Sequence, residues 1–417
     1  MQETIFSYMD PAPPCASENN ILTGLTVAIQ PNLSVRGWPA QAGSRALEGF
    51  TAIEDATVVE RLRQAGATIK GAIYMSELGL GLTGNTGADA LKNNKADIVL
   101  ITDNLGESRV SACAAGVFGF KPSYGIVSRF GLIGLIPSME CCGILAKKLA
   151  DVSRVMSVIA GNDNRDLSMP DFGPDFGPES GFEFESGLKL PDFSRVFEAK
   201  KPARSCGVIK ECLEIMEKDE QSAYEAAISK LAKRGIQPIE VSLEDFNMVR
   251  TAHNIIGAVE ASSSAGKYDS VRYGHRAAGS KNWNEMYLNS RAESFGMPIK
   301  SYLFQGAYFQ HENYNAFVDA ARIRRRLSAG LDQALENADF IMLPTIRKAI
   351  DPFTADTVNE IYDSFPWTPI ANITGHPAIT LPNMLTCKDM DLGMQIIGPR
   401  FKDANILSLS AQLKDQA

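Results

Sequence analysis

The stretch that decides the fold is ADIVLITDNLGESRVSACAAGVFGFKPS, residues 96–123. Its first part, 96–102, is too uniformly apolar for a half-exposed edge strand and predicts a buried one. A turn marked by Gly106 follows. The small side chains of 107–123 favour a helix that packs tightly against its neighbours. A buried strand that runs through a glycine turn into a helix is typical of an α/β protein.

The same alternation of strands and helices extends to both sides of this stretch. Helices with one apolar face are predicted at 55–67, 219–236 and 313–335, with a last helix from about residue 403. Apolar runs predict strands at 25–30, 68–75, 237–243, 338–345 and 392–400. This order predicts the fold class α/β, with a parallel-rich sheet.

Composition narrows the class of protein. The chain has 417 residues, 45% of them hydrophobic, and a net charge of -8, which disfavours general binding to nucleic acid or to an anionic membrane. No apolar run approaches the ~18 residues of a membrane span, and no secretory leader is recognisable, so we expect a cytoplasmic protein. The four histidines are scattered and no phosphate-binding glycine loop occurs, so we expect neither a metal site nor a cofactor.

The chain divides into an N-terminal tail, residues 1–20, and one large domain, residues 21–417. Between about 162 and 201 the sequence becomes rich in glycine, proline and acidic residues and contains a short tandem repeat. We interpret this segment as a surface excursion, either a mobile loop or a partner-binding segment.

Four segments carry a resemblance to a known family: LTGLTVAIQPN (22–32), GFKPSYGIVSRFGLI (119–133), KYDSVRYGHR (267–276) and NITGHPAITLPN (372–383). In order and approximate spacing they resemble the amidase signature family, and most closely its branch of aminoacyl-tRNA amidotransferase A subunits. The resemblance implies a single large mixed, mostly parallel β-sheet covered by helices on both faces. It also implies hydrolysis of amides by a lysine, a bridging serine in cis geometry and a nucleophilic serine, with backbone N–H groups of a glycine turn holding the oxyanion.

The triad positions carry other residues in this chain. The lysine position falls on Gln30, whose neutral amide cannot take up a proton at pH 7, and the nucleophile position falls on Glu107. Gly106 and Arg109 match the family pattern around the nucleophile, and the resemblance makes both candidate substrate-binding residues. The bridging serine falls on Thr83 in one alignment, whereas in the other its loop is deleted.

Other residues could replace the triad or keep its pocket. Ser108 is a poor substitute, because one residue along a helix turns a side chain by about 100°. Glu107 either stabilises the helix start or acts as a recruited catalyst. The resemblance implies that Arg272 grips a substrate carboxylate and that Asp363 holds its amino group. A structural ion pair is the alternative for Arg272.

Three functional readings follow. The first is a catalytically degenerate amidase-family protein, a binding or complex-assembly subunit with a protein partner or as a homo-oligomer, and with a small amide or carboxylate as ligand. The second is an amide hydrolase or amidotransferase A-like subunit with catalysis rebuilt around Glu107. A genuine amidotransferase A subunit is disfavoured, because Gln30 and Glu107 cannot release ammonia from glutamine in the family's way.

Overall fold

The computed structural model describes residues 5–11, 20–172, 188–198, 202–347, 351–388 and 390–415. Within these ranges no helix is long and apolar enough to cross a membrane. The same ranges contain no group of three or more His, Cys, Asp or Glu residues placed to hold a metal ion.

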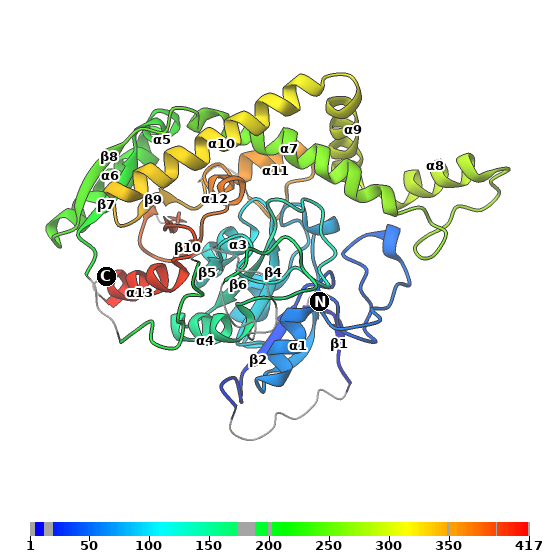
Figure 1. The fold of residues 1–417 in the computed structure, drawn as a ribbon, viewed down its shortest axis with the longest axis horizontal. Coiled ribbons are helices and arrows are strands. Elements are labelled where there is room, and N and C mark those ends of the chain that lie inside the picture. The colour runs from blue at the N-terminus through cyan, green and yellow to red at the C-terminus, as the bar shows by residue number, and fades with distance from the viewer. Residues whose placement is uncertain are drawn as a thin grey trace, which may run out of the picture.

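One 11-stranded mixed sheet forms the centre of the molecule (Figure 1). Pairing is parallel where β2 lies between β3 and β4 and where β7 lies between β8 and β9, and it is antiparallel from β4 through β6, β5, β10 and β13 to β9. The strands, in sheet order, are β1 (Phe6–Met9), β3 (Thr68–Ile73), β2 (Thr26–Ile29), β4 (Ile98–Asp103), β6 (Cys141–Ala146), β5 (Phe118–Lys121), β10 (Ala378–Leu381), β13 (Met394–Ile397), β9 (Ile341–Pro344), β7 (Ser205–Ile209) and β8 (Gln237–Val241). A separate ribbon joins β11 (Thr386–Cys387) to β12 (Met390–Asp391).

Strand β4 shows that helices cover both faces of the sheet, because successive side chains of a strand point to opposite faces. Ile98 and Leu100 belong to the cluster that contains α1 (Thr57–Gln64) and α4 (Leu149–Ile159). Val99 and Ile101 belong to a second cluster, with α2 (Gly87–Lys92) and α3 (Glu107–Ala115). All six residues of β4 are buried, and the expected α/β fold with a large mixed sheet covered on both sides is confirmed. The sheet was expected to be mostly parallel, but its described strands make four parallel and six antiparallel pairings.

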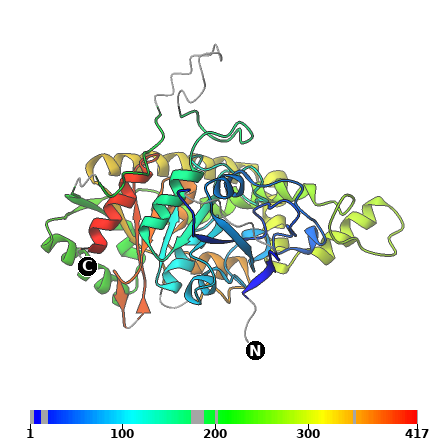
Figure 2. The ribbon, with the colours of Figure 1, turned by 90° about the horizontal axis from the view of Figure 1, so that it is seen from below.

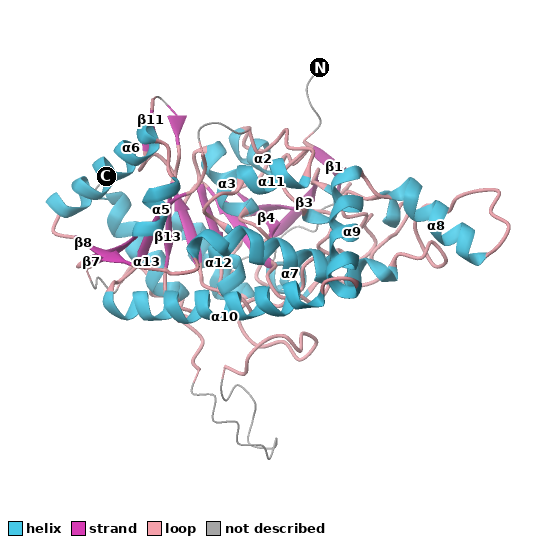
Figure 3. Ribbon diagram, turned by 90° about the horizontal axis from the view of Figure 1, so that it is seen from above, coloured by secondary structure: helices cyan, strands magenta, loops and turns pink. Residues whose placement is uncertain are grey.

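Further helices extend the molecule beyond the sheet. The long helix α10 (Tyr314–Asn337) runs along one side beside α12 (Pro369–Thr374) and α7 (Val249–Ser264) (Figure 3). Helix α8 (Trp283–Ser294) projects away from the body of the molecule (Figures 2 and 3). The remaining helices are α5 (Lys210–Ile215), α6 (Lys218–Lys233), α9 (Met297–His311), α11 (Val358–Ser364) and α13 (Asp403–Asp415).

Two segments differ from the sequence-based expectation. The helix expected over 107–123 ends at Ala115, because Gly116 adopts the left-handed conformation that closes a helix, and residues 118–121 then form β5. Within the N-terminal segment assigned to a tail, β1 pairs with β3. Part of the expected excursion, 173–187 and 199–201, lies outside the described residues.

Candidate functional site

The candidate site lies where β4 ends and α3 begins. The three residues between them, 104–106, form a tight turn, and Gly106 has φ 125°. A Cβ atom at Gly106 would lie 2.2 Å from the Cβ of Thr368, so only glycine fits this position without a shift of the neighbouring chain. Glu107, the first residue of α3, therefore follows directly after this turn and lies close to the end of β4.

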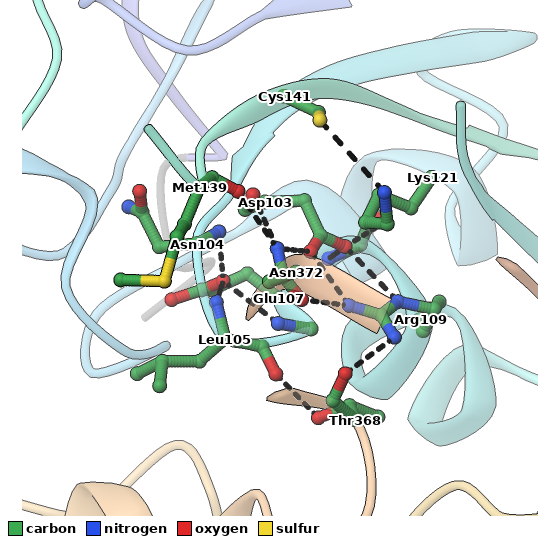
Figure 4. Close-up of polar contacts among 12 residues, drawn as sticks. Asp103, Asn104, Leu105, Glu107, Arg109, Lys121, Met139, Cys141, Thr368 and Asn372 are labelled. Atoms are coloured by element: carbon green, nitrogen blue, oxygen red, sulfur yellow. Dashed lines mark hydrogen bonds and ion pairs between the residues drawn. The ribbon is translucent and has the colours of Figure 1, made fainter. Parts of the chain in front are cut away.

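The carboxylate of Glu107 is enclosed by backbone N–H groups (Figure 4). Its Oε2 accepts hydrogen bonds from the N–H groups of Asn104 at 2.7 Å, Leu105 at 2.7 Å and Gly106 at 3.1 Å. Its Oε1 accepts from the N–H of Gly81 at 3.1 Å. We call these four donors the Glu107 nest. Successive N–H groups of this kind make a concave binding site for an anion, and here the chain's own carboxylate fills it.

Opposing effects set the proton affinity of Glu107. Burial, together with the nearby negative charge of Asp103, raises the pKa of Glu107 to about 7, whereas the N–H groups of Leu105 and Asn104 oppose this rise. The side chain is 1% exposed. A carboxyl group with a pKa near neutrality can in principle exchange protons, but at this burial and with both oxygens hydrogen-bonded it is fixed in place.

Ser108, the next residue, is tied to Asp103. The carboxylate Oδ2 of Asp103 accepts from the Ser108 hydroxyl in a short hydrogen bond and from its N–H at 3.2 Å. Arg109 donates from Nη2 to Asp103 Oδ1 at 2.8 Å and from Nη1 to the carbonyl of Thr368 at 2.8 Å. Burial opposes ionisation of Asp103, but the charge of Arg109 and the hydrogen bonds of its neighbours lower the pKa of Asp103 below its ordinary value. Ser108 therefore holds the helix start and does not face a free base.

Gln30 lies at the end of β2 and is fully buried. Its side-chain Oε1 accepts from the N–H of Thr102 at 2.8 Å, and its backbone N–H donates to the carbonyl of Leu100 at 3.1 Å. Gln30 therefore links the end of β2 to β4. A carbonyl oxygen that already accepts from the backbone offers no basic group for a proton.

The structure places Thr83 outside the nest. Its side chain is on the surface and its hydroxyl donates to the carbonyl of Ala355 in a short hydrogen bond. Gly81, two residues earlier, supplies one of the four N–H donors to Glu107. The segment expected to carry the bridging serine thus enters the site through its backbone.

Arg272 and Asp363 are not brought together. Arg272 is exposed and its guanidinium lies 5.6 Å from the centre of the Tyr273 ring, while Asp363 pairs with Arg250. Among the described residues, no hydrogen bond or ion pair joins Arg272 or Asp363 to Glu107 or to each other. Their assignment to a substrate pocket stays a prediction.

A series of hydrogen-bonded buried side chains, which the sequence alone did not reveal, contacts the turn at the carbonyl of Asn104. His253 Nε2 lies 2.9 Å from the carbonyl oxygen of Asn104, and Nδ1 lies 2.9 Å from the hydroxyl of Tyr362. Burial lowers the pKa of His253 to about 4, so the ring is neutral, and because a carbonyl can only accept, Nε2 carries the proton and Nδ1 accepts from Tyr362. The hydroxyl of Tyr302 lies 3.0 Å from that of Tyr362 and completes the chain.

A buried lysine, Lys121, lies near the ion pair of Asp103 and Arg109. Lys121 Nζ donates to the carbonyl of Pro122 at 2.8 Å and lies 3.8 Å from Cys141 Sγ (Figure 4). Burial lowers the pKa of Lys121. In the described part of the chain, no hydrogen bond connects Lys121 to Glu107 or Ser108, so it does not take the position of a base for either side chain.

The long-range partners of the site were invisible in the sequence. Thr368 and Asn372 reach the turn from α12, and Asn372 Nδ2 donates to both the carbonyl and the carboxylate of Asp103. The only sequence signal for these contacts was the segment 372–383, which resembles a family motif, begins with Asn372 and follows Thr368 by four residues. Nothing in the local pattern marked His253, Tyr302 or Tyr362 as neighbours of residue 107.

Comparisons with known proteins agree with this arrangement of elements. A family model described as Amidase matches residues 8–93 and 96–407. The A subunit of the glutamyl-tRNA(Gln) amidotransferase from Symbiobacterium thermophilum is 31% identical over 428 residues, which span 93% of this chain and 82% of that protein. Its counterpart from Sulfurisphaera tokodaii is 30% identical over 421 residues, with 94% of this chain and 84% of that protein covered.

Solved structures show the same fold. The A subunit of the glutamyl-tRNA(Gln) amidotransferase from Thermotoga maritima superposes with a TM-score of 0.75 at 23% identity, with 97% of this chain and 86% of that chain covered. The peptide amidase of Stenotrophomonas maltophilia gives a TM-score of 0.73 at 21% identity, covering 95% and 83%. At these identities the superpositions bear on the fold alone.

Proposed function

Because this chain belongs to the amidase family, we propose that it is a member without amide-hydrolysing activity, whose role is binding or the assembly of a complex. The resemblance places the family's nucleophile in the turn between a buried strand and the next helix, which in this chain is the turn between β4 and α3. Here that turn is built around Glu107.

The observation that carries the proposal is the filled Glu107 nest. Stabilising an oxyanion requires N–H donors that are free to bind the developing charge. All four donors around residue 107 are already bonded to the Glu107 carboxylate. A substrate carbonyl at this place would have to displace a carboxylate that the chain itself carries.

Two further contacts support the same conclusion. Gln30, at the lysine position, is a neutral amide bonded to Thr102, so it supplies no general base. Ser108 donates its hydroxyl to Asp103, whose lowered pKa keeps that carboxylate a weak base. Losing members of a catalytic unit typically reduces the rate by about four to six orders of magnitude.

The relatives' name suggests how such a protein would work. The matched relatives from Symbiobacterium thermophilum and Sulfurisphaera tokodaii are each named as one component of an amidotransferase. We propose that this chain likewise acts with a protein partner or as a homo-oligomer in the cytoplasm, and that a small amide or carboxylate is its ligand. Analytical ultracentrifugation of the purified chain tests the homo-oligomer, since a single monomeric species would contradict it.

One observation favours a second candidate function, an amidase or amidotransferase-like enzyme with catalysis rebuilt around Glu107. Its pKa of about 7 suits a general base at neutral pH. Against this stands its burial, because the carboxylate is closed off from a substrate in this conformation.

Ammonia release decides between the two candidates. Glutamine, asparagine and simple aliphatic and aryl amides are incubated with the wild-type chain, Glu107→Ala and Glu107→Gln, with an active peptide amidase as positive control. Release at background level in all three proteins is the expected result. Turnover by the wild type that disappears in both variants overturns the proposal and makes Glu107 a recruited catalyst.

A further inference from the structure

A cavity separate from the Glu107 nest opens at the far end of α12. It has a volume of about 380 Å³ and lies between α10, the C-terminal end of α12 and the loop after β13. Arg324 and Ser328 of α10, and Ile373 and Gly375 beyond the middle of α12, contribute to its walls. None of the residues that hold Glu107 lines it. Its volume is within the range of about 300–1,000 Å³ typical of small-molecule sites.

Arg324 gives the cavity a positive charge that no carboxylate neutralises directly. Its guanidinium donates to the carbonyl of Ile373 at 2.8 Å, to the hydroxyl of Ser138 at 2.7 Å and to the carbonyl of Ser138 at 2.8 Å. These acceptors are all neutral, and in the described ranges no carboxylate lies within ion-pair distance of Arg324. Glu260 is near enough to raise its pKa, but that carboxylate accepts from the N–H of Ser138 at 2.9 Å.

A partly buried charge without a counter-ion is unfavourable, and an anion in the cavity would remove the cost. Burial itself lowers the pKa of Arg324. An arginine has five N–H hydrogens, so its three bonds to the protein leave two, one on each Nη atom, as separate single donors for a ligand. The three bonds also fix the orientation of the guanidinium, which reduces the entropy lost when a ligand binds.

A second arginine also lines the cavity. Arg400 is half-exposed and donates from Nη2 to Asp332 at 2.8 Å, so its charge is balanced while its other nitrogens stay available. The pair Arg400–Asp332 is neutral overall, whereas Arg324 has no directly bonded carboxylate and its positive charge is offset only in part, at longer range, by Glu260. This balance suits a monoanion better than a phosphate dianion.

The rest of the wall is mixed. Ser168, Ser328 and Thr374 contribute hydroxyl groups, and apolar surface comes from Tyr124, Met169, Pro170, Ile373 and Phe401. The cavity is much larger than a simple ion, so an organic anion has room to lay its apolar part against these side chains. We propose that this cavity binds a small organic carboxylate whose apolar body lies against Tyr124 and Phe401 and whose carboxylate lies between Arg324 and Arg400.

Titration calorimetry with benzoate, acetate and inorganic phosphate tests the proposal on the full chain. We expect benzoate to bind saturably with a dissociation constant of about 1 mM or lower, and acetate and phosphate to bind about tenfold more weakly or less. Arg400→Gln and Arg324→Lys should each weaken benzoate binding about tenfold or more, because each removes part of the paired donors. The Arg324→Lys variant keeps the positive charge and loses the planar N–H donors of the guanidinium.

The control is Arg322→Gln, on the exposed side of the same helix, where Asp319 is the ion-pair partner of Arg322 among the described residues. It should bind benzoate as the wild type does. Arg324 also holds Ile373 and Ser138, so Arg324→Lys must show a wild-type circular dichroism spectrum, and Arg400→Gln decides if it does not. Absence of saturable benzoate binding, binding that Arg400→Gln leaves unchanged, or phosphate binding as tight as benzoate each overturns the proposal.

Discussion

Asn372 joins α12 to the end of β4, since its Nδ2 lies 2.9 Å from both the backbone oxygen and the Oδ1 of Asp103. Its Oδ1 accepts from Nη2 of Arg109 in a short hydrogen bond. One buried amide thus holds the strand end, the helix start and α12 together. The geometry of the turn that carries Glu107 depends on this contact as much as on the local sequence.

Replacing Asn372 by alanine should lower the free energy of unfolding by roughly 3 kcal/mol, because it leaves buried partners of a polar network unsatisfied. Urea denaturation measures this change. Asn337→Ala is the control, since Asn337 is exposed and, among the described residues, its side chain donates to the carbonyl of Gln333 alone, and it should change stability by about 0.5 kcal/mol or less. Equal effects of the two substitutions would contradict the structural role of Asn372.

Removing the Glu107 carboxylate should expose the donors of the nest to small anions. Glu107→Ala leaves four buried N–H groups without their acceptor and should lower stability by about 2–4 kcal/mol. Formate should then raise the melting temperature of this variant by mass action, because it binds only the folded state. Chloride at equal ionic strength and formate with the wild type are the controls. A formate effect of the same size on the wild type would contradict binding of formate in the exposed nest.

Stability should depend on pH through Glu107. Its folded-state pKa, about 7, is above the unfolded value, so the folded protein binds the extra proton between about pH 4.3 and 7. The contribution of Glu107 is therefore most favourable below about pH 4.3 and is lost as the pH rises through about 7. The unfolding free energy of the wild type minus that of Glu107→Gln should fall by about 3 kcal/mol across this range.

Urea denaturation of both proteins between pH 4 and 8 checks this dependence. The subtraction removes what the more distant ionisable groups contribute equally to both proteins. Asp103 interacts with Glu107, but its lowered pKa places its titration at more acidic pH. A difference that is flat, or that rises with pH, would show that the four N–H groups outweigh burial and keep Glu107 charged.

Gly106→Ala should be strongly destabilising, by about 3 kcal/mol or more, because its Cβ would overlap Thr368 and its φ of 125° is unfavourable for an L-residue. Gly161→Ala separates the two causes. Gly161 has a similar positive φ, 116°, but its Cβ would meet only the Cδ2 atom of Leu190, at an ordinary contact distance of 3.4 Å. Thermal melts should show a markedly larger loss for residue 106, and similar losses would mean that backbone strain alone is responsible.

The sequence predicted the regular elements best where the hydrophobic pattern was long and local. Strand β4 and helix α10 were predicted within a few residues of their observed bounds, because their apolar periodicity is unambiguous. The short strand β5 was taken for helix, since four residues after a left-handed Gly116 carry too little periodicity to separate strand from helix. The close packing inferred from small residues was sound, because a Cβ at Gly119 would lie 2.4 Å from the carbonyl of Ser108.

For the site, the sequence predicted which single residues take part, but not what they contact. The resemblance located Gln30 and Glu107, and both are buried at the ends of neighbouring strands. What the Glu107 carboxylate binds depends on the path of the backbone through Gly81 and Asn104. Such contacts are set by tertiary packing, and no local propensity encodes them.

The Glu107 nest also determines which reagents will recognise this protein. A group attached to the chain competes at an effective concentration on the order of 10⁵ M or more when it is well oriented. No dissolved carboxylate or boronate reaches such a level. Covalent probes and transition-state analogues designed for active amidases should therefore pass over this chain in a mixed proteome, and its absence from an activity-based profile would be a property of the folded protein rather than a sign of low abundance.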